Sequence, residues 1–263
     1  MNLNWANDSL WDDGAAEVAR YAAERITGGK VRRFEYAFLT VKEDFLVKED
    51  YATELLVKSD NITGMNFLRA MKVNLFARIE TDEYPYHFLT SIFLRRDNPA
   101  VMFKLTHSSQ EWQGNTFKEL LQFERAAKLI YHSYWEGEGD GKQELGTYIL
   151  TEDQLPFSLR ALAFSDTLKV KQRILETLIT NKVGTPQLYD AAIEVKAPEQ
   201  LRIDSTMRMA WRVEVLLAPA KKNIYWFDKA APNLLLKHTA WDGRKLDLKS
   251  VSRYNYGENQ PKP

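Results

Sequence analysis

The chain has 263 residues, which is enough for one large β domain, and its 36 basic and 36 acidic residues give a formal net charge of 0. The absence of cysteine excludes disulfides, thiolate nucleophiles, zinc fingers and iron–sulfur clusters. The balanced charge argues against a nucleic-acid partner, and no apolar run approaches the roughly 20 residues of a membrane-spanning helix.

The first part of the chain predicts antiparallel strands joined by tight turns. Residues 14–26 are rich in alanine, but the turn Thr27-Gly28-Gly29-Lys30 and the alternation beyond it favour a hairpin over a helix. The charged stretch 42–60 predicts a loop. Alternating segments then predict a three-stranded meander, at 67–81, 84–96 and 101–107.

The rest of the chain repeats this style. A strand at 126–135 is followed by the glycine-rich stretch 136–142, which predicts a hairpin loop or, alternatively, a domain break near 137–142. A short helix is expected at 155–164. The remaining segments predict strands at 145–150, 168–180, 188–195, 207–218, 223–228, 234–241 and 245–254.

Roughly a dozen strands are too many for one flat sheet, so the sheet must curl, close or stack. We therefore expect a mainly β fold: a large, strongly curved antiparallel sheet, half-barrel or barrel-like, with one or two short helices. The prediction is a single domain over 1–263, with an ordered core from about residue 10 to residue 256 and a disordered tail at 257–263.

A curled sheet has a concave face, and such faces often hold small ligands. The densest polar segment, 104–115, lies where a strand is expected to turn back. Its polar side chains could contact a ligand or could simply satisfy the backbone of a turn. The candidate ligand-binding residues are His87, Arg95, Lys104, His107, Gln110, Glu111, Trp112 and Asn115.

Catalytic and metal sites are not indicated by any spacing. The four histidines form no metal-binding pair, and His87 has no placed nucleophile or carboxylate partner. Adjacent acidic residues such as Asp82 and Glu83 point to opposite faces of a strand, which does not suit a carboxylate dyad. The sequence predicts no cofactor.

Two regions resemble known proteins. The segments Tyr84-Pro85-Tyr86-His87-Phe88 and Phe93-Leu94-Arg95-Arg96-Asp97, with residues 39–45 and 109–114, resemble an uncharacterised family of bacterial hypothetical proteins and lipoproteins. The pattern Tyr225-Trp226-Phe227-Asp228 with Trp241-Asp242-Gly243-Arg244 is similar to the end of envelope proteins related to Lol-type lipoprotein carriers. That similarity implies a curved antiparallel sheet wrapped around a lipid.

These observations lead to three hypotheses. The first is a non-catalytic cell-envelope protein that holds a lipid or other amphipathic molecule, with Arg95, Lys104, His107 and Glu111 orienting its head group. It would be periplasmic or anchored through a removed signal, although a cytoplasmic location stays open. The second is a hydrolase that uses His87 or His107 with Glu111. The third is a structural or interaction protein with a filled core. The sequence does not predict the oligomeric state.

Overall fold

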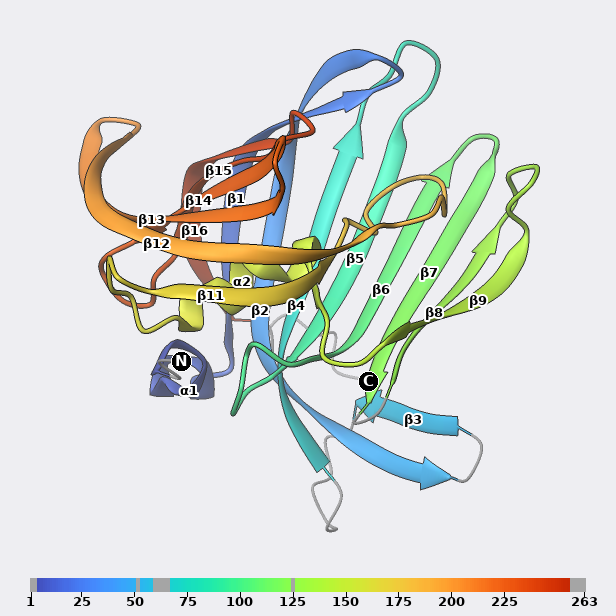
Figure 1. The fold of residues 1–263 in the computed structure, drawn as a ribbon, viewed down its shortest axis with the longest axis horizontal. Helices are drawn as coiled ribbons and strands as arrows, with labels where there is room; N and C mark the ends of the chain where they lie inside the picture. Colours follow the sequence, from blue (N-terminus) through green and yellow to red (C-terminus); the bar gives the residue numbers. More distant parts are fainter. Residues whose placement is uncertain (1–3, 51–52, 59–66, 124–125, 256–263) are drawn as a thin grey trace.

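The structure is a computed structural model that describes residues 4–50, 53–58, 67–123 and 126–255. Its strands form one curved sheet that does not close, which confirms the expected half-barrel-like antiparallel fold (Figure 1). In sheet order the strands are β10 (Leu150–Thr151), β11 (Lys169–Leu175), β12 (Leu188–Ile203), β13 (Thr206–Ala218), β14 (Lys221–Asp228), β15 (Leu235–Thr239), β16 (Lys245–Asn255), β1 (Ala15–Thr27), β2 (Lys30–Asp50), β4 (Phe67–Ile79), β5 (Tyr86–Arg95), β6 (Met102–Glu111), β7 (Gly114–Phe123), β8 (Ala126–Ser133) and β9 (Asp140–Gly146).

The strand order is nearly sequential. Neighbours on this path are antiparallel except β10 and β11, and β3 (Thr53–Lys58) pairs with β2 off the path. The path runs from β10 to β16, continues with β1, and ends at β9. The two edges of the sheet, β9 and β10, are therefore joined by only a short stretch of chain, at 147–149. Residues 137–142, where a domain break was an alternative, form the end of the β8–β9 connection and the start of β9, which pairs with β8 as a hairpin.

The β1–β2 hairpin confirms the prediction made from the Gly-Gly turn. Thr27 pairs with Lys30, and the two residues between them, Gly28 and Gly29, have φ values of 60° and 73°. Two successive positive φ angles are typical of the type I′ turn, whose twist matches that of a hairpin. The alanine-rich segment is thus held as a strand by its pairing, against its helix propensity.

The loop predicted at 42–60 is wrong over its described residues, because 42–50 form the end of β2 and Thr53–Lys58 form β3, while 51–52 and 59–60 lie outside the description. Lys42 and Asp44 alternate with Val41, Glu43 and Phe45, which are buried on the other face of the strand. Glu43 pairs with Lys72 at 3.2 Å and Lys42 with Asp12 at 2.7 Å, so cross-element ion pairs take the place of the solvent expected around a loop.

The chain turns back within 104–115, as expected, but the turn comes later than the predicted strand end at residue 107. Strand β6 continues to Glu111, and only Trp112 and Gln113 separate it from β7. The predicted tail at 257–263 lies outside the described residues.

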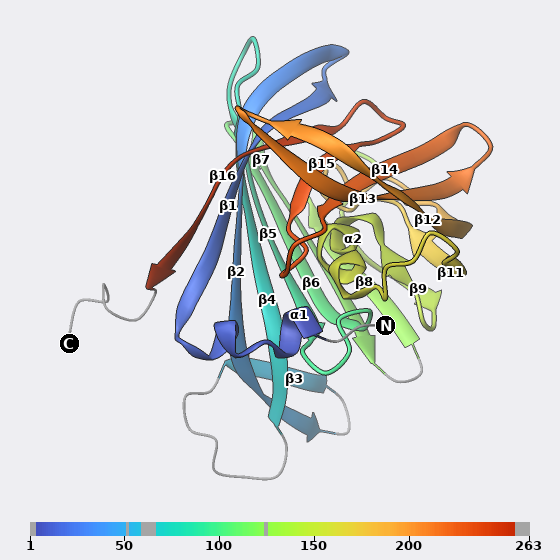
Figure 2. The ribbon, with the colours of Figure 1, turned by 90° about the vertical axis from the view of Figure 1, so that its left-hand side faces the viewer.

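The hollow of the sheet is filled by residues 151–162, which we call the plug. The plug comprises the 3₁₀ turn η2 (Glu152–Gln154), the helix α2 (Leu155–Ser158) and the 3₁₀ turn η3 (Leu159–Ala161), and every residue in it is buried. It lies between the two halves of the curved sheet (Figures 1 and 2). The ring of Phe157 packs 5.4 Å from that of Phe38 on β2. The predicted short helix is therefore present, but it forms part of the core.

Local bonds explain why the plug turns at its start. The hydroxyl of Thr151 accepts a hydrogen bond from the Gln154 amide at 3.2 Å, and the Gln154 side chain accepts one from the Thr151 amide at 3.1 Å. This reciprocal arrangement is a capping box, which satisfies two amides at a helix start. Pro156 lies in the first turn of α2, where a missing N–H costs nothing.

The N-terminal segment packs beside the plug. Its helix α1 (Asn4–Asn7) and 3₁₀ turn η1 (Ser9–Asp12) bury Trp5 and Trp11, so the ordered core begins before residue 10. The Arg160 guanidinium lies 4.6 Å from the centre of the Trp5 ring. Across the described ranges, no helix has the length and apolarity needed to cross a membrane.

Candidate ligand-binding cavity

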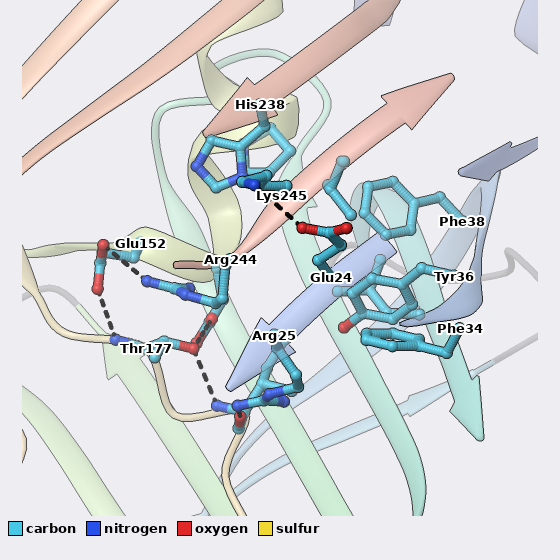
Figure 3. Close-up of a pocket in the computed structure, with 15 residues that line it drawn as sticks. Glu24, Arg25, Phe34, Tyr36, Phe38, Glu152, Thr177, His238, Arg244 and Lys245 are labelled. Carbon is cyan, nitrogen blue, oxygen red and sulfur yellow. Dashed lines mark hydrogen bonds and ion pairs between the residues drawn. The ribbon is translucent and has the colours of Figure 1, made fainter. Parts of the chain in front are cut away.

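A partly enclosed cavity of about 60 Å³ lies between the sheet and the start of the plug. Strand β2 supplies one wall through Phe34, Tyr36 and Phe38, which alternation places on one face (Figure 3). The opposite side is charged and is formed by Glu152 and by Arg244, which precedes β16. The cavity has room for a few water molecules or for part of a small ligand.

Arg244 is paired with two carboxylates. Its Nη2 lies 3.0 Å from Oε1 of Glu152 and its Nε lies 2.7 Å from Oδ2 of Asp242. Burial alone would lower the pKa of Arg244, but the charges of Glu152 and Asp242 outweigh burial and raise it above its ordinary value. Asn223 donates a further hydrogen bond to Glu152. This network is structural, because its donors and acceptors already satisfy one another.

Arg25 on β1 is a cation of a different kind. Its Nη2 donates to the carbonyl oxygen of Ile179 at 3.0 Å, and its guanidinium lies 5.2 Å from the centre of the Phe88 ring. No carboxylate of the described residues forms an ion pair with it. Burial, and then the nearby charge of Arg244, lower the pKa of Arg25, yet a guanidinium stays protonated in proteins. Among the cations of the described cavity lining, Arg25 is therefore the one without an ion-pair partner, although the charges of Asp242 and Asp153 lie near enough to act on it.

Two polar atoms on the lining residues are buried without a hydrogen-bond partner: Oη of Tyr36 and Nε2 of His238. His238 is 6% exposed and stacks on Tyr225 at 4.3 Å. Burial lowers the pKa of His238 to about 3, so its ring is neutral, and burial raises the pKa of Tyr36, so its hydroxyl keeps its proton. Each such unsatisfied group typically costs about 1–3 kcal/mol, which makes this pair unusual in a folded protein.

A segment that we call the strap, residues 176–184, lies over the cavity. Its Thr177 and Ile179 line the cavity, and Asp153 of the plug accepts bonds from the Thr177 hydroxyl and the Leu178 amide. Burial raises the pKa of Asp153. At the other end, the Glu138 carboxylate accepts from the amides of residues 183 and 184 at 3.0 and 3.1 Å.

Buried Lys118 fastens the middle of the strap to β7. Its ammonium donates to the carbonyl oxygens of Leu178 and Thr180 and to the Thr180 hydroxyl, at 2.9, 3.0 and 2.6 Å. Burial lowers the pKa of Lys118 to about 7. Lys118 has three neutral oxygen partners and forms no ion pair with a described carboxylate, although the charges of Asp153 and Glu138 act on it, so hydrogen bonds hold it more than ion pairing does.

The structure separates the residues that the sequence placed in one site. His107 is buried on the concave face, with Nδ1 at 2.9 Å from the Thr90 hydroxyl and Nε2 at 3.1 Å from the Thr180 carbonyl oxygen. Burial lowers its pKa to about 3. Glu111 lies on the same face four residues further, roughly 13 Å along the strand. These two side chains cannot share a proton, as the hydrolase hypothesis requires.

The remaining candidates also lie away from the cavity. Trp112 is 79% exposed in the β6–β7 turn, where it stacks on Tyr84. Arg95 is exposed and pairs with Asp97 at 2.6 Å, and Lys104 pairs with Glu119 at 2.7 Å. Three exposed residues lie on the convex face: His87, Gln110 and Asn115.

Sequence reasoning missed the residues that do line the cavity. Arg25 and His238 come from strands at opposite ends of the sequence, so no spacing links them. The alternation at 33–42 placed Phe34 and Tyr36 on one face, and this signal could have marked β2 as a cavity wall. No family model, curated protein or solved structure matches the chain. The described residues contain no cluster of three or more side chains suited to a metal ion.

Proposed function

We propose that this protein binds a small amphipathic molecule, with its polar end in the cavity beneath the strap. One observation carries the proposal: the cavity combines an aromatic wall with a cation and two buried polar atoms that lack partners. Unsatisfied groups of this kind persist where a ligand or an ordered water completes them. The apolar part of an amphipathic ligand would pack against the aromatic wall, and its polar part would bond to the polar groups of the cavity.

The plug limits the size of the ligand. The sequence led us to expect a hollow open along the concave face, in the manner of a lipid carrier. The chain itself occupies that hollow through Leu155, Phe157 and Leu159, each at most 3% exposed. A cavity of about 60 Å³ is much smaller than a typical small-molecule pocket, so it can hold one small head group and the atoms next to it. A cell-envelope location is supported by the sequence resemblance alone.

Binding can be tested with three ligands of matched length: hexanoate, 1-hexanol and hexylamine. We expect at least one of them to raise the melting temperature of the protein. A ligand at ten times its Kd contributes about 1.4 kcal/mol, or several degrees for a chain of this size. The same ligand should be followed by calorimetry to obtain its stoichiometry, which we expect to be one.

Two substitutions locate the binding site. Ile179→Phe fills the cavity from the strap and should abolish the stabilisation by ligand. Val170→Phe makes a comparable enlargement at a position on β11 that is 40% exposed and is not part of the cavity lining, and it should leave binding unchanged. If none of the three ligands binds, or if Ile179→Phe binds as well as the wild type, the proposed function is wrong.

A further inference from the structure

We infer that the polar end of the ligand is a single carboxylate, held by the guanidinium of Arg25. This inference rests on the proposed function and specifies the chemical class of its ligand. Three observations support it: which hydrogen-bond donors of the cavity have no acceptor, which charges lie around them, and which apolar side chains line the cavity beside them.

Arg25 is the donor that is both held in place and available. The Ile179 carbonyl oxygen and the Phe88 ring fix its guanidinium from two sides. A guanidinium carries five N–H donors in one plane, and the structure gives a hydrogen-bond acceptor to one nitrogen, Nη2. The other edges of this group match the two oxygens of a carboxylate. Arg244 is not the residue that binds the carboxylate of the ligand, because its guanidinium already pairs with Glu152 and Asp242.

The charge balance favours one negative charge over two. The third cation of the lining, Lys245, pairs with Glu24 at 3.0 Å. Glu152 and Asp153 border the same space, and a second negative charge on the ligand would be repelled by them. A carboxylate carries one charge at neutral pH, whereas a phosphate monoester carries nearly two. A monocarboxylate is therefore the better match.

The neutral groups and the walls agree with this assignment. The Tyr36 hydroxyl keeps its proton and can donate to a carboxylate oxygen, and Nε2 of the neutral His238 ring can donate in the tautomer that places the proton on it. Phe34 and Leu75 supply the apolar surface for an alkyl or aryl group next to the carboxylate. Figure 3 shows Arg25, Tyr36 and His238 around the same space. The ligand class is therefore a short alkyl or aryl monocarboxylic acid.

Calorimetric titration of the full chain with four six-carbon ligands tests this inference. We expect hexanoate to bind at least about tenfold more tightly than 1-hexanol, hexylamine or hexyl phosphate. Arg25→Gln should weaken hexanoate binding by about 10- to 100-fold while changing the affinity for 1-hexanol by less than about threefold. Arg25→Lys, which keeps the charge but loses the planar fork, should give an intermediate loss.

The matched control is Arg20→Gln. Arg20 lies on the same strand, but it is exposed and pairs with Glu35, so hexanoate binding should not change.

If 1-hexanol or hexylamine binds as tightly as hexanoate, the carboxylate assignment is wrong while the proposed function stands. If hexyl phosphate binds more tightly than hexanoate, the inference that the ligand carries a single negative charge is wrong. An unchanged hexanoate affinity in Arg25→Gln overturns the role of Arg25. If none of the ligands binds, both proposals fail. The relative affinities of the four ligands for the wild-type protein decide the ligand class even if a variant does not fold.

Discussion

The guanidinium of Arg160 in the plug and the carboxylate of Glu17 on β1 form a buried ion pair with two contacts. Nη1 lies 2.8 Å from Oε1 and Nη2 lies 3.2 Å from Oε2, and the two side chains are 2% and 7% exposed. The same guanidinium donates from Nε to the Pro232 carbonyl oxygen and lies over the Trp5 ring. One side chain thus joins the plug to β1, to the chain before β15 and to the N-terminal helix.

Removal of Arg160 should destabilise the protein strongly. Arg160→Met leaves the Glu17 carboxylate buried without its partner, and such losses typically cost about 3–5 kcal/mol. Urea unfolding followed by tryptophan fluorescence measures this difference. Arg20→Met removes a pair whose side chains are 50% and 42% exposed, and it should cost less than about 1 kcal/mol. Equal losses in the two variants would contradict the anchoring role.

Lys118 should make stability depend on pH above neutrality. Its pKa is lowered to about 7 in the folded protein, against 10.5 ordinarily, so between these values the unfolded chain binds a proton that the folded protein lacks. Stability should therefore rise with pH through this window, because the cost of burying the ammonium is complete and constant below pH 7 and is removed as the pH approaches 10.5.

The comparison with Lys118→Met isolates this effect. The free energy of unfolding of the wild type, minus that of the variant, should increase between pH 7 and pH 9 by at most about 1.4 kcal/mol per unit. Lys171→Met, at an exposed position, should give a difference that does not change with pH. A constant difference for Lys118→Met would show that its ammonium titrates at an ordinary value.

Glu138 should hold the far end of the strap. In Glu138→Gln, the acceptor of the Val183 and Gly184 amides loses its charge, so we expect faster hydrogen exchange of the amides at 177–184 and a loss of about 1–3 kcal/mol. Glu136→Gln, an exposed change in the same hairpin loop, is the control. Exchange that is equally fast in both variants would mean that Glu138 does not restrain the strap.

Acid should weaken the same contact. Burial alone would raise the pKa of Glu138, but hydrogen bonds from Val183 and Ser133 outweigh burial and lower it below 4.5. The contribution of Glu138 is thus complete above pH 4.5 and is lost as the pH falls through the lower, folded value. In the wild type, hydrogen exchange of the strap amides should accelerate as the pH falls below 4.5, once the rates are corrected for the intrinsic pH dependence of amide exchange.

The turn after β1 should tolerate asparagine better than valine. Gly28 has a φ of +60°, and no atom lies within 4 Å of the place a Cβ would take. The cost of substitution is therefore one of backbone conformation, about 1–2 kcal/mol for Gly28→Val and less for Gly28→Asn, since asparagine accepts positive φ. Thermal unfolding of the two variants tests this. Equal melting temperatures would contradict it.

The sheet could be predicted because its signal is local. Each strand alternates along its own sequence, as Met71, Val73 and Leu75 do on the concave face of β4, and all three are buried. The helix of the plug could be predicted but its place in the core could not, because Glu152 and Asp153 have the charge of surface residues. Their burial depends on partners such as Arg244 and Thr177, which come from distant elements.

The candidate site was missed for the same physical reason. The polar segment 104–115 attracted attention because its residues are adjacent in sequence, but the alternation of a strand sends Gln110 and Glu111 to opposite faces. The cavity brings together Arg25, Tyr36 and His238 only once β15 and β16 lie beside β1 and β2. Such a site is a product of sheet order, which one sequence does not reveal.

The pairing of β1 with β16 has a consequence for how the chain is assembled. If β3 is set aside, every other antiparallel pair in the sheet joins two strands that are consecutive in the sequence. The β1–β16 pair joins strands from opposite ends of the sequence, so it closes by far the longest loop. During synthesis, one edge of β1 stays without its partner until residue 255 has left the ribosome. A circular permutant opened at 147–149 would instead meet each partner as it emerged, and its contact order would fall.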